Sequence, residues 1–192
     1  MAGIESKGNH GEPGWVTDVL NFWFSELTKD DWFRKSDVVD GTIRKRFLAL
    51  HEGLVATGGV ADGAAPREIL AAIIVFDQFS RNLFRGEARA FAADALALGL
   101  ARAAVARGID ASMTGDERLF LYMPFEHSED IEDQEKSVEL TLKLGDEGLL
   151  HYATAHRNII SRFGRFPHRN AALGRPSTDD EIEFLKQAGS SF

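Results

Sequence analysis

Apolar residues recur along most of the chain at spacings of three and four positions, which is the period of a helix with one buried face. One such stripe runs through Ile43, Phe47, Leu50 and Leu54. No stretch of about four to eight residues alternates apolar and polar positions, and no Asn-Gly or Asp-Gly turn joins two such stretches. We therefore predict an all-α protein, built either as a bundle or as a right-handed array of helical hairpins.

The boundaries of about eight helices follow from turn and capping residues. The predicted helices cover residues 15–25, 38–57, 66–86, 87–107, 115–124, 131–142, 149–163 and 178–187. Capping boxes at 114–117 and 178–181 open the fifth and the last helix, and Pro66 suits a first helical position. Pro124 lacks the amide hydrogen that would bond back to Phe120, so we expect the fifth helix to kink or stop there.

The length fits one domain. At 192 residues the chain is long enough to bury about 70 per cent of the surface that it exposes when unfolded. Residues 1–14 are rich in glycine and polar side chains. We expect a flexible arm over 1–14 and a single all-α domain over 15–192.

Composition narrows the class of protein further. The first ten residues lack a basic segment followed by an apolar one, and the longest apolar run, ILAAIIVF at 69–76, is far shorter than the about 20 residues of a membrane span. We expect neither a secretion signal nor a membrane partner. The formal net charge of −8 argues against a nucleic-acid partner, because phosphates are held mainly by Lys and Arg. Cysteine is absent, which suits a reducing compartment, and we expect a cytoplasmic protein.

Charge is distributed unevenly along the second half of the chain. Residues 116–147 contain eleven acids and three bases, whereas residues 148–175 contain five arginines and no acid. An antiparallel pair of helices with complementary flanks explains this most simply. The alternative is a basic pocket, because arginines gathered without matching carboxylates attract an anion.

Three polar motifs interrupt the amphipathic pattern, each at a predicted helix end or kink. They read DQFSRNLFR at 77–85, EHSED at 126–130 and RFPHRN at 165–170. One shared site explains three irregularities more economically than three separate sites, so we expect the three motifs to converge. The candidate ligand-binding residues are Asp77, Arg81, Asn82, Arg85, Arg165 and Arg169. The candidate catalytic residues are Glu126, His127 and His168.

These residue types allow chemistry, and they also allow a structural role. Arginines bind a carboxylate or phosphate through charged hydrogen bonds, and a carboxylate beside a histidine can act as an acid and base pair. A buried ion network of Arg81, Glu126 and Arg165 would instead tie helices together. His156 lies in an apolar stripe and is expected to be a satisfied core histidine. The spacings fit no metal, nucleotide or nucleophilic-serine motif, so we expect no metal and no cofactor.

The motifs FDQFSRNLFRG, FLYMPFEHSED and FGRFPHRNAALGRPST resemble those of the bacterial family catalogued as domain of unknown function 924. The resemblance extends in order from Trp15 to Leu185. Ser80 departs from it, because the family usually has proline at that position, and a kink after Phe79 is therefore in doubt for this chain. The resemblance implies a tetratricopeptide-like α/α superhelix, and it brings no established activity, substrate or cofactor.

We consider two functions from different classes and favour the first, with the second as the alternative. The first is a binding module that holds an anionic small molecule or a peptide, with the three polar motifs as its site. The second is a small-molecule enzyme with hydrolase-type acid and base chemistry at Glu126, His127 and His168. A closed pocket with convergent Arg and His favours a small-molecule site, whereas an open groove favours a peptide.

Overall fold

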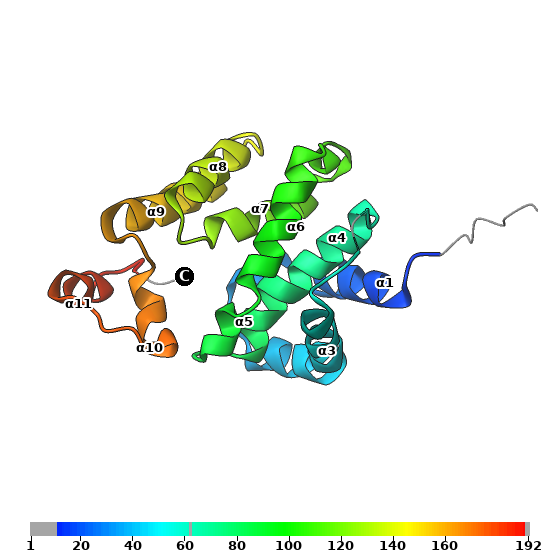
Figure 1. Ribbon diagram of the computed structural model, residues 1–192, viewed down its shortest axis with the longest axis horizontal. Helices are drawn as coiled ribbons and strands as arrows, with labels where there is room; N and C mark the ends of the chain where they lie inside the picture. The colour runs from blue at the N-terminus through cyan, green and yellow to red at the C-terminus, as the bar shows by residue number, and fades with distance from the viewer. Residues whose placement is uncertain (1–10, 62, 191–192) are drawn as a thin grey trace, which may run out of the picture.

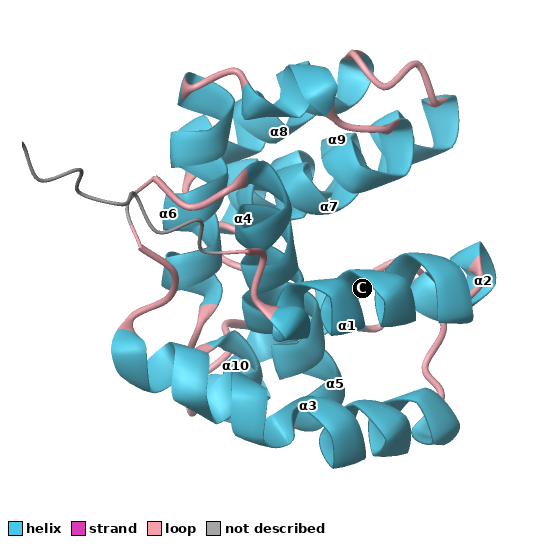
Figure 2. Cartoon of the chain, turned by 90° about the vertical axis from the view of Figure 1, so that its right-hand side faces the viewer, coloured by secondary structure: helices cyan, strands magenta, loops and turns pink. Residues whose placement is uncertain are grey.

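The computed structural model describes residues 11–61 and 63–190 of the chain, and the described part consists of helices and loops without a strand (Figure 2). The all-α class is therefore confirmed. Most of the predicted arm, residues 1–10, lies outside the described residues, and so do residues 62, 191 and 192. The tetratricopeptide-like superhelix that the resemblance implies stays a prediction.

The first half of the chain forms helices that surround one long central helix. Its elements are α1 (Gly14–Asn21), the π-helix η1 (Phe22–Glu26), α2 (Lys29–Phe33), α3 (Asp37–Thr57), α4 (Pro66–Ile73), the π-helix η2 (Ile74–Phe79) and α5 (Ser80–Leu83). The elements α4, η2 and α5 follow one another without a break and together form the central helix. They correspond to the predicted helix 66–86.

The second half of the chain adds antiparallel helices and a C-terminal segment. This segment, residues 164–190, follows α9 and is shown in orange and red beside it in Figure 1. Its elements are the 3₁₀ helix η3 (Ala88–Phe91), α6 (Asp94–Ala106), the 3₁₀ helix η4 (Ile109–Ser112), α7 (Gly115–Glu126), α8 (Ile131–Leu142), α9 (Glu147–Phe163), the 3₁₀ helix η5 (Pro167–Arg169), α10 (Asn170–Leu173) and α11 (Asp179–Leu185). The helix α8 packs against both α7 and α9.

The main core is aromatic and lies around the central helix. Four apolar residues of that helix at spacings of four and three, Ala72, Phe76, Phe79 and Leu83, are buried on one face. The ring of Phe79 stacks on Phe47 with 4.9 Å between centroids. Burying each such side chain contributes about 1.5 to 3 kcal/mol, so this core is the chief source of stability.

A small apolar cluster joins the C-terminal segment to α9. Its members are Ile159, Ile160 and Phe166, with Phe163 and Phe184 packed against them. The residues of the main core end before this segment begins. The segment is therefore held to α9 by this small apolar cluster, and to the earlier helices by the polar groups described below.

The structure corrects three expectations about the helices. The segments 28–37 and 164–177, predicted as connections, contain the short helices α2 and α10. The predicted helix 87–107 begins only at Asp94, after the 3₁₀ turn η3. The helix α7 does not stop at Pro124 but continues through it to Glu126. The missing amide of Pro124 removes one helical hydrogen bond, the bond to the carbonyl of Phe120, and the helix ends two residues later.

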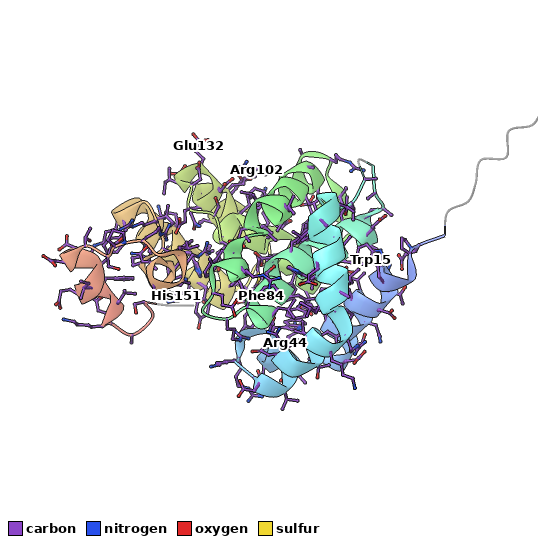
Figure 3. All side chains as sticks on the ribbon, turned by 60° about the horizontal axis from the view of Figure 1, so that its bottom comes forward. Trp15, Arg44, Phe84, Arg102, Glu132 and His151 are labelled. Atoms are coloured by element: carbon purple, nitrogen blue, oxygen red, sulfur yellow. The ribbon has the colours of Figure 1, made fainter. Side chains whose placement is uncertain are left out.

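Acid and base pairing between neighbouring helices differs from the simplest expectation. The helices α8 and α9 do pack together, as the charge pattern predicted. Among the described residues, however, the ion pairs of α8 go to Arg102, Lys136 and Lys143 rather than to arginines of α9. Figure 3 labels Arg102 on α6 and Glu132 on α8, and Arg102 bonds to Asp133, the residue that follows Glu132.

The capping box that opens α7 gives a first testable prediction. The Thr114 hydroxyl accepts a hydrogen bond from the Glu117 amide, and the Glu117 carboxylate accepts one from the Thr114 amide. Replacing Thr114 by Ala is expected to lower the free energy of unfolding by about 1 kcal/mol, because one helix amide loses its acceptor. Urea titrations followed by circular dichroism would measure this. Thr114→Ser keeps the hydroxyl, and an equal loss in that variant would contradict the capping role.

No helix of the described chain is both long enough and apolar enough to cross a membrane.

Candidate functional site

The site is built around Asp77, which lies in the π-helix η2 and is only 1% exposed. A π-turn is wider than an α-turn and is frequent at functional positions. His127 and Gln78 donate hydrogen bonds to the Asp77 carboxylate at 2.7 and 2.6 Å, and Arg81 lies at 3.2 Å. Burial alone would raise the pKa of Asp77, but Arg81 and His127 outweigh it and hold that pKa well below its usual value. Asp77 is therefore an ionised carboxylate inside the protein.

The bond to Asp77 sets the tautomer of His127. An ionised carboxylate only accepts hydrogen bonds, so Nδ1 of His127 carries the hydrogen and Nε2 keeps its lone pair. Burial and the charge of Arg81 lower the pKa of His127 below its ordinary value, and Asp77 opposes them only in part. The imidazole is neutral at pH 7, with its basic nitrogen directed away from Asp77.

A second carboxylate, Asp94 at the start of α6, joins two arginines from different motifs. Arg81 donates to it twice, at 3.0 and 3.1 Å, and Arg169 donates to it at 3.2 Å. Arg169 also donates to the carbonyl oxygen of His127 at 3.0 Å. The first and third motifs are thus connected through Asp94, and the third motif touches the second directly.

Glu126 differs from Asp77 in its protonation state. It lies at the C-terminal end of α7, and its Oε1 is 3.2 Å from Nδ1 of His156 on α9. Burial, and then the neighbouring charge of Asp77, raise the pKa of Glu126 to about 8. Glu126 is therefore a neutral carboxylic acid at pH 7, beside an ionised one.

Two further imidazoles complete what we call the polar cluster. Nδ1 of His156 donates to the carbonyl oxygen of Tyr152 at 2.9 Å, and burial lowers the pKa of His156 to about 3. The half-buried ring of His168 lies 5.5 Å from that of Phe166, and burial, followed by Arg169, lowers its pKa to about 4. The polar cluster comprises Asp77, Arg81, Asp94, Glu126, His127, His156, His168 and Arg169.

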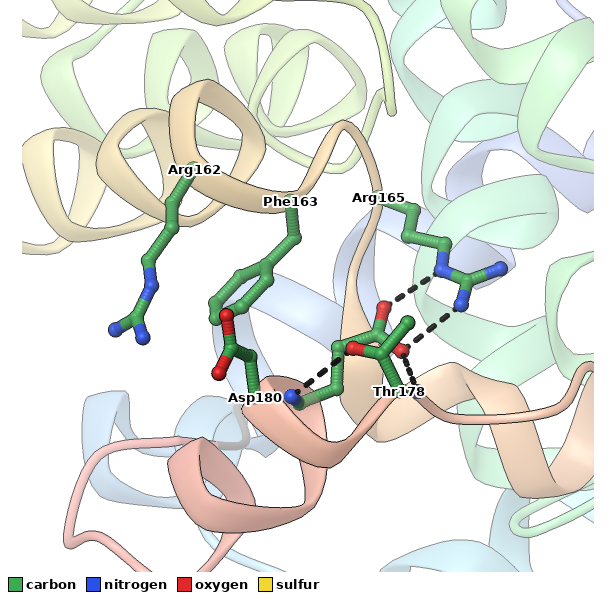
Figure 4. A pocket seen from close by; sticks show the side chains of 6 residues that line it. Arg162, Phe163, Arg165, Thr178 and Asp180 are labelled. Atoms are coloured by element: carbon green, nitrogen blue, oxygen red, sulfur yellow. Dashed lines mark hydrogen bonds and ion pairs between the residues drawn. The ribbon is translucent and has the colours of Figure 1, made fainter.

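Arg165 lies outside the polar cluster and, with Thr178 and Glu181, lines a hollow of the surface (Figure 4). It donates twice to the buried carboxylate of Glu181, at 2.6 and 2.8 Å, and this bonding lowers the pKa of Glu181 to about 2. The same carboxylate accepts a hydrogen bond from the Thr178 amide, and the Thr178 hydroxyl accepts one from the Glu181 amide, which completes the capping box of α11. Arg165 therefore holds α11 against the end of α9.

Asn82 and Arg85 also turn away from the polar cluster. Both donate to Asp40 on α3, Asn82 at 2.7 Å and Arg85 at 2.5 and 2.9 Å. Arg44 of α3 donates in return to the carbonyl oxygen of Leu83. These bonds fix α3 against α5 at the end of the first motif.

Glu129 anchors the C-terminal segment. It accepts hydrogen bonds from the amide of Phe166 at 2.7 Å and from Arg175 at 2.6 and 2.9 Å. These contacts join the loop before α8 to the segment that carries Arg169. They hold the third motif over the first two.

The structure brings together much of what the sequence predicted to converge. Asp77, Arg81, Glu126, His127 and His168 lie in or beside one cluster, whereas Arg165 does not. The predicted arginines without matching carboxylates are not observed. Arg81, Arg85 and Arg165 each donate two hydrogen bonds to one carboxylate, whereas Arg169 donates one. The predicted ion network of Arg81, Glu126 and Arg165 does not form. Arg81 pairs with Asp77 and Asp94, Glu126 contacts His156, and Arg165 pairs with Glu181.

Sequence reasoning missed Asp94, Glu129 as an anchor, Arg175 and Glu181. One signal could have revealed Asp94, because it is the sole acid between Glu87 and Asp110 in an alanine-rich segment. His156 was expected to be a satisfied core histidine, and its bond to Tyr152 confirms that expectation.

Two hollows open at the surface near the C-terminal end of α9. One, of about 410 Å³, is lined by Arg162, Phe163, Arg165, Thr178, Asp180 and Glu181. The other, of about 570 Å³, is lined by Glu129, Asp130, Ile131, Glu132, Ile160, Ser161 and Gly164. Neither is lined by Asp77, Glu126 or His127. Within the part of the chain that the structure describes, no three His, Asp or Glu side chains are placed to hold a metal ion.

Fold and cluster together define an all-α protein in which three separate polar motifs meet between helices. The model of a family described as "Bacterial protein of unknown function (DUF924)" matches residues 19–189, and the chain belongs to this family. The chain is also similar to a solved structure described as "Structure of Protein of Unknown Function ATU0120 from Agrobacterium tumefaciens". The two are 39% identical, the match covers 89% of this chain and 96% of the other, and the TM-score is 0.83. No curated protein matches the chain.

Proposed function

We propose that the chain is an enzyme that transfers protons at a small polar molecule, with His127 as general base and Glu126 as general acid. The observation that supports this is the 2.7 Å bond from His127 to the buried carboxylate of Asp77, beside a carboxyl group whose pKa is raised to about 8. Two carboxyl groups whose pKa values are pushed in opposite directions are typical of acid and base pairs.

Each residue has a distinct role in this proposal. Asp77 orients His127 and stabilises the imidazolium that forms when Nε2 takes a proton. In a hydrolysis, His127 takes that proton from water, the water oxygen attacks the substrate, and Glu126 gives its proton to the leaving atom. Proton transfer from His127 back to Glu126 then restores both groups. Asp77 stays ionised throughout.

Matched variants test this function. A screen of p-nitrophenyl acetate, phosphate and glycoside substrates would be followed by His127→Gln and Glu126→Gln, each expected to lower kcat by about a hundredfold or more. The reaction should slow above about pH 8, where Glu126 loses its proton. His151→Gln is the control, because His151 is an exposed histidine of α9 outside the polar cluster. Equal rates in Glu126→Gln and His151→Gln would contradict an acid role for Glu126.

The second candidate is a binding module for an anionic small molecule or a peptide. One observation favours it: Arg81 and Arg169 converge beside His127 and share the carboxylate of Asp94 as an acceptor. A binding module would keep its affinity for an anion in Glu126→Gln and would turn over no substrate. For either candidate we propose a cytoplasmic location, which the absence of cysteine supports.

A further inference from the structure

We propose that Arg169 holds an oxyanion, a carboxylate or a phosphate, of the small molecule on which the polar cluster acts. The inference rests on the proposed function only in that the ligand shares this cluster. It assigns the negative group of the ligand to one residue of the third motif.

Arg169 is the exception among the arginines of the three motifs. Its side chain is 7% exposed, compared with 20% for Arg81 and 28% for Arg165. Arg81 and Arg165 each donate twice to one carboxylate, whereas Arg169 donates once to Asp94, an acceptor that it shares with Arg81. The most buried guanidinium thus has the least carboxylate bonding.

One donor of Arg169 lacks an acceptor. Its Nε is fully buried and forms no hydrogen bond with any described residue. Buried donors are nearly always paired, and a charged one is especially costly to leave unpaired. Consistent with this, burial and the neighbouring charge of Arg81 lower the pKa of Arg169 to about 10. An oxyanion on Nε would give this donor an acceptor, and its negative charge would also favour the charged guanidinium of Arg169.

The rings around Arg169 determine where an oxyanion can bind. The guanidinium lies 4.7 Å from the ring of Phe91 and 4.6 Å from that of Phe166. Aromatic rings pack against the face of a guanidinium, so its in-plane N–H groups remain for an acceptor. Because Nη2 bonds the carbonyl oxygen of His127, a ligand held at Nε lies close to His127 and Glu126.

Entry of the ligand requires the C-terminal segment to move. Arg169 ends the one-turn helix η5, and the bonds from Phe166 and Arg175 to Glu129 hold this part of the chain down. Gly164, before η5, has a φ of 67° that suits glycine. Local opening of this polar contact would expose Nε without disturbing the main core.

The experiment follows the Nε–H signal of Arg169 by NMR in protein labelled with ¹⁵N-arginine. Acetate and inorganic phosphate are titrated separately, with sodium chloride at equal ionic strength as reference. We expect a saturable shift of the Arg169 signal with one of the two anions, which also distinguishes a carboxylate ligand from a phosphate. Melting curves with the same anion are then compared among variants. Arg169→Gln should weaken apparent binding by about ten- to a hundredfold. Arg162→Gln, which removes an exposed arginine of α9, should leave it unchanged.

A signal of Arg169 that neither anion moves would overturn the inference, and this measurement uses the unaltered chain, so it does not depend on a variant that folds. Equal anion affinity in Arg169→Gln and the unaltered protein would overturn it as well. If Arg169 responds but His127→Gln and Glu126→Gln leave turnover unchanged, the proposed acid and base chemistry fails while the anion site stands. If those variants lose turnover and Arg169 does not respond, only the anion site fails.

Discussion

Replacing Asp77 by Ala is expected to lower the free energy of unfolding by about 3 to 5 kcal/mol, the range for breaking a buried ion pair. The change leaves the Nδ1 hydrogen of His127 and the side-chain amide of Gln78 without their acceptor, and both groups are largely enclosed. Arg81 keeps Asp94, so one part of the network survives. Denaturant titrations at pH 7, followed by circular dichroism, would measure the loss.

Asp116→Ala provides the matched control for this change. Asp116 pairs with Lys29 at 2.6 Å, but both side chains are exposed. Such a surface pair contributes about 1 kcal/mol or less. If Asp77→Ala were no more harmful than Asp116→Ala, the buried carboxylate would not be the anchor of the site.

The second large effect concerns pH and Glu126. The pKa of Glu126 is about 8 in the folded protein, above its ordinary value of 4.5, so the folded state binds the proton more tightly than the unfolded chain. Below about pH 4.5 both states hold the proton and no penalty arises. As the pH rises from there towards 8, the unfolded chain releases the proton and the folded state does not, so stability falls by about 1.4 kcal/mol per pH unit.

Glu126→Gln isolates this contribution, because glutamine has the shape of the protonated acid and does not titrate. Relative to that variant, the unaltered protein is expected to lose about 4 kcal/mol between about pH 5 and pH 8. Other titrating groups affect both proteins in a similar way and largely cancel in the difference. Stability curves of the two proteins that run parallel across this range would show that the pKa of Glu126 is not raised.

Local periodicity was enough to predict the longer helices, because each apolar stripe lies within about 20 residues of sequence. Asp77 shows where that information ends. Asp77, Arg81 and Arg85 are four residues apart, so a regular helix would place them on a stripe turned away from the apolar one, yet Asp77 is buried. The π-turn widens the helix there, and the residue that bonds Asp77 is His127, 50 positions later in the chain. A helical period carries no information about such a distant partner.

The arginines show a second limit of sequence reasoning. Residues 148–175 contain no acid, which raised a pocket of unpaired cations as the alternative to a complementary helix pair. The carboxylates that bond Arg169 and Arg175 come from Asp94 and Glu129, 75 and 46 positions away. Charge counted within one segment therefore describes that segment only. The convergence of three motifs was predictable, because each one places polar groups where a helix ends.

The separation of Asp94 and Arg169 in the chain also bears on how the protein is made. A chain that grows from its N-terminus releases nearly all of the main core, which lies before α9, well before Arg169 is synthesised. Until then Asp94 has only Arg81 as its partner among the arginines of the cluster, and Glu129 has neither Phe166 nor Arg175. The helices before α9 are thus complete while the polar cluster still lacks Arg169. The cluster is completed when the third motif, residues 165–170, is synthesised.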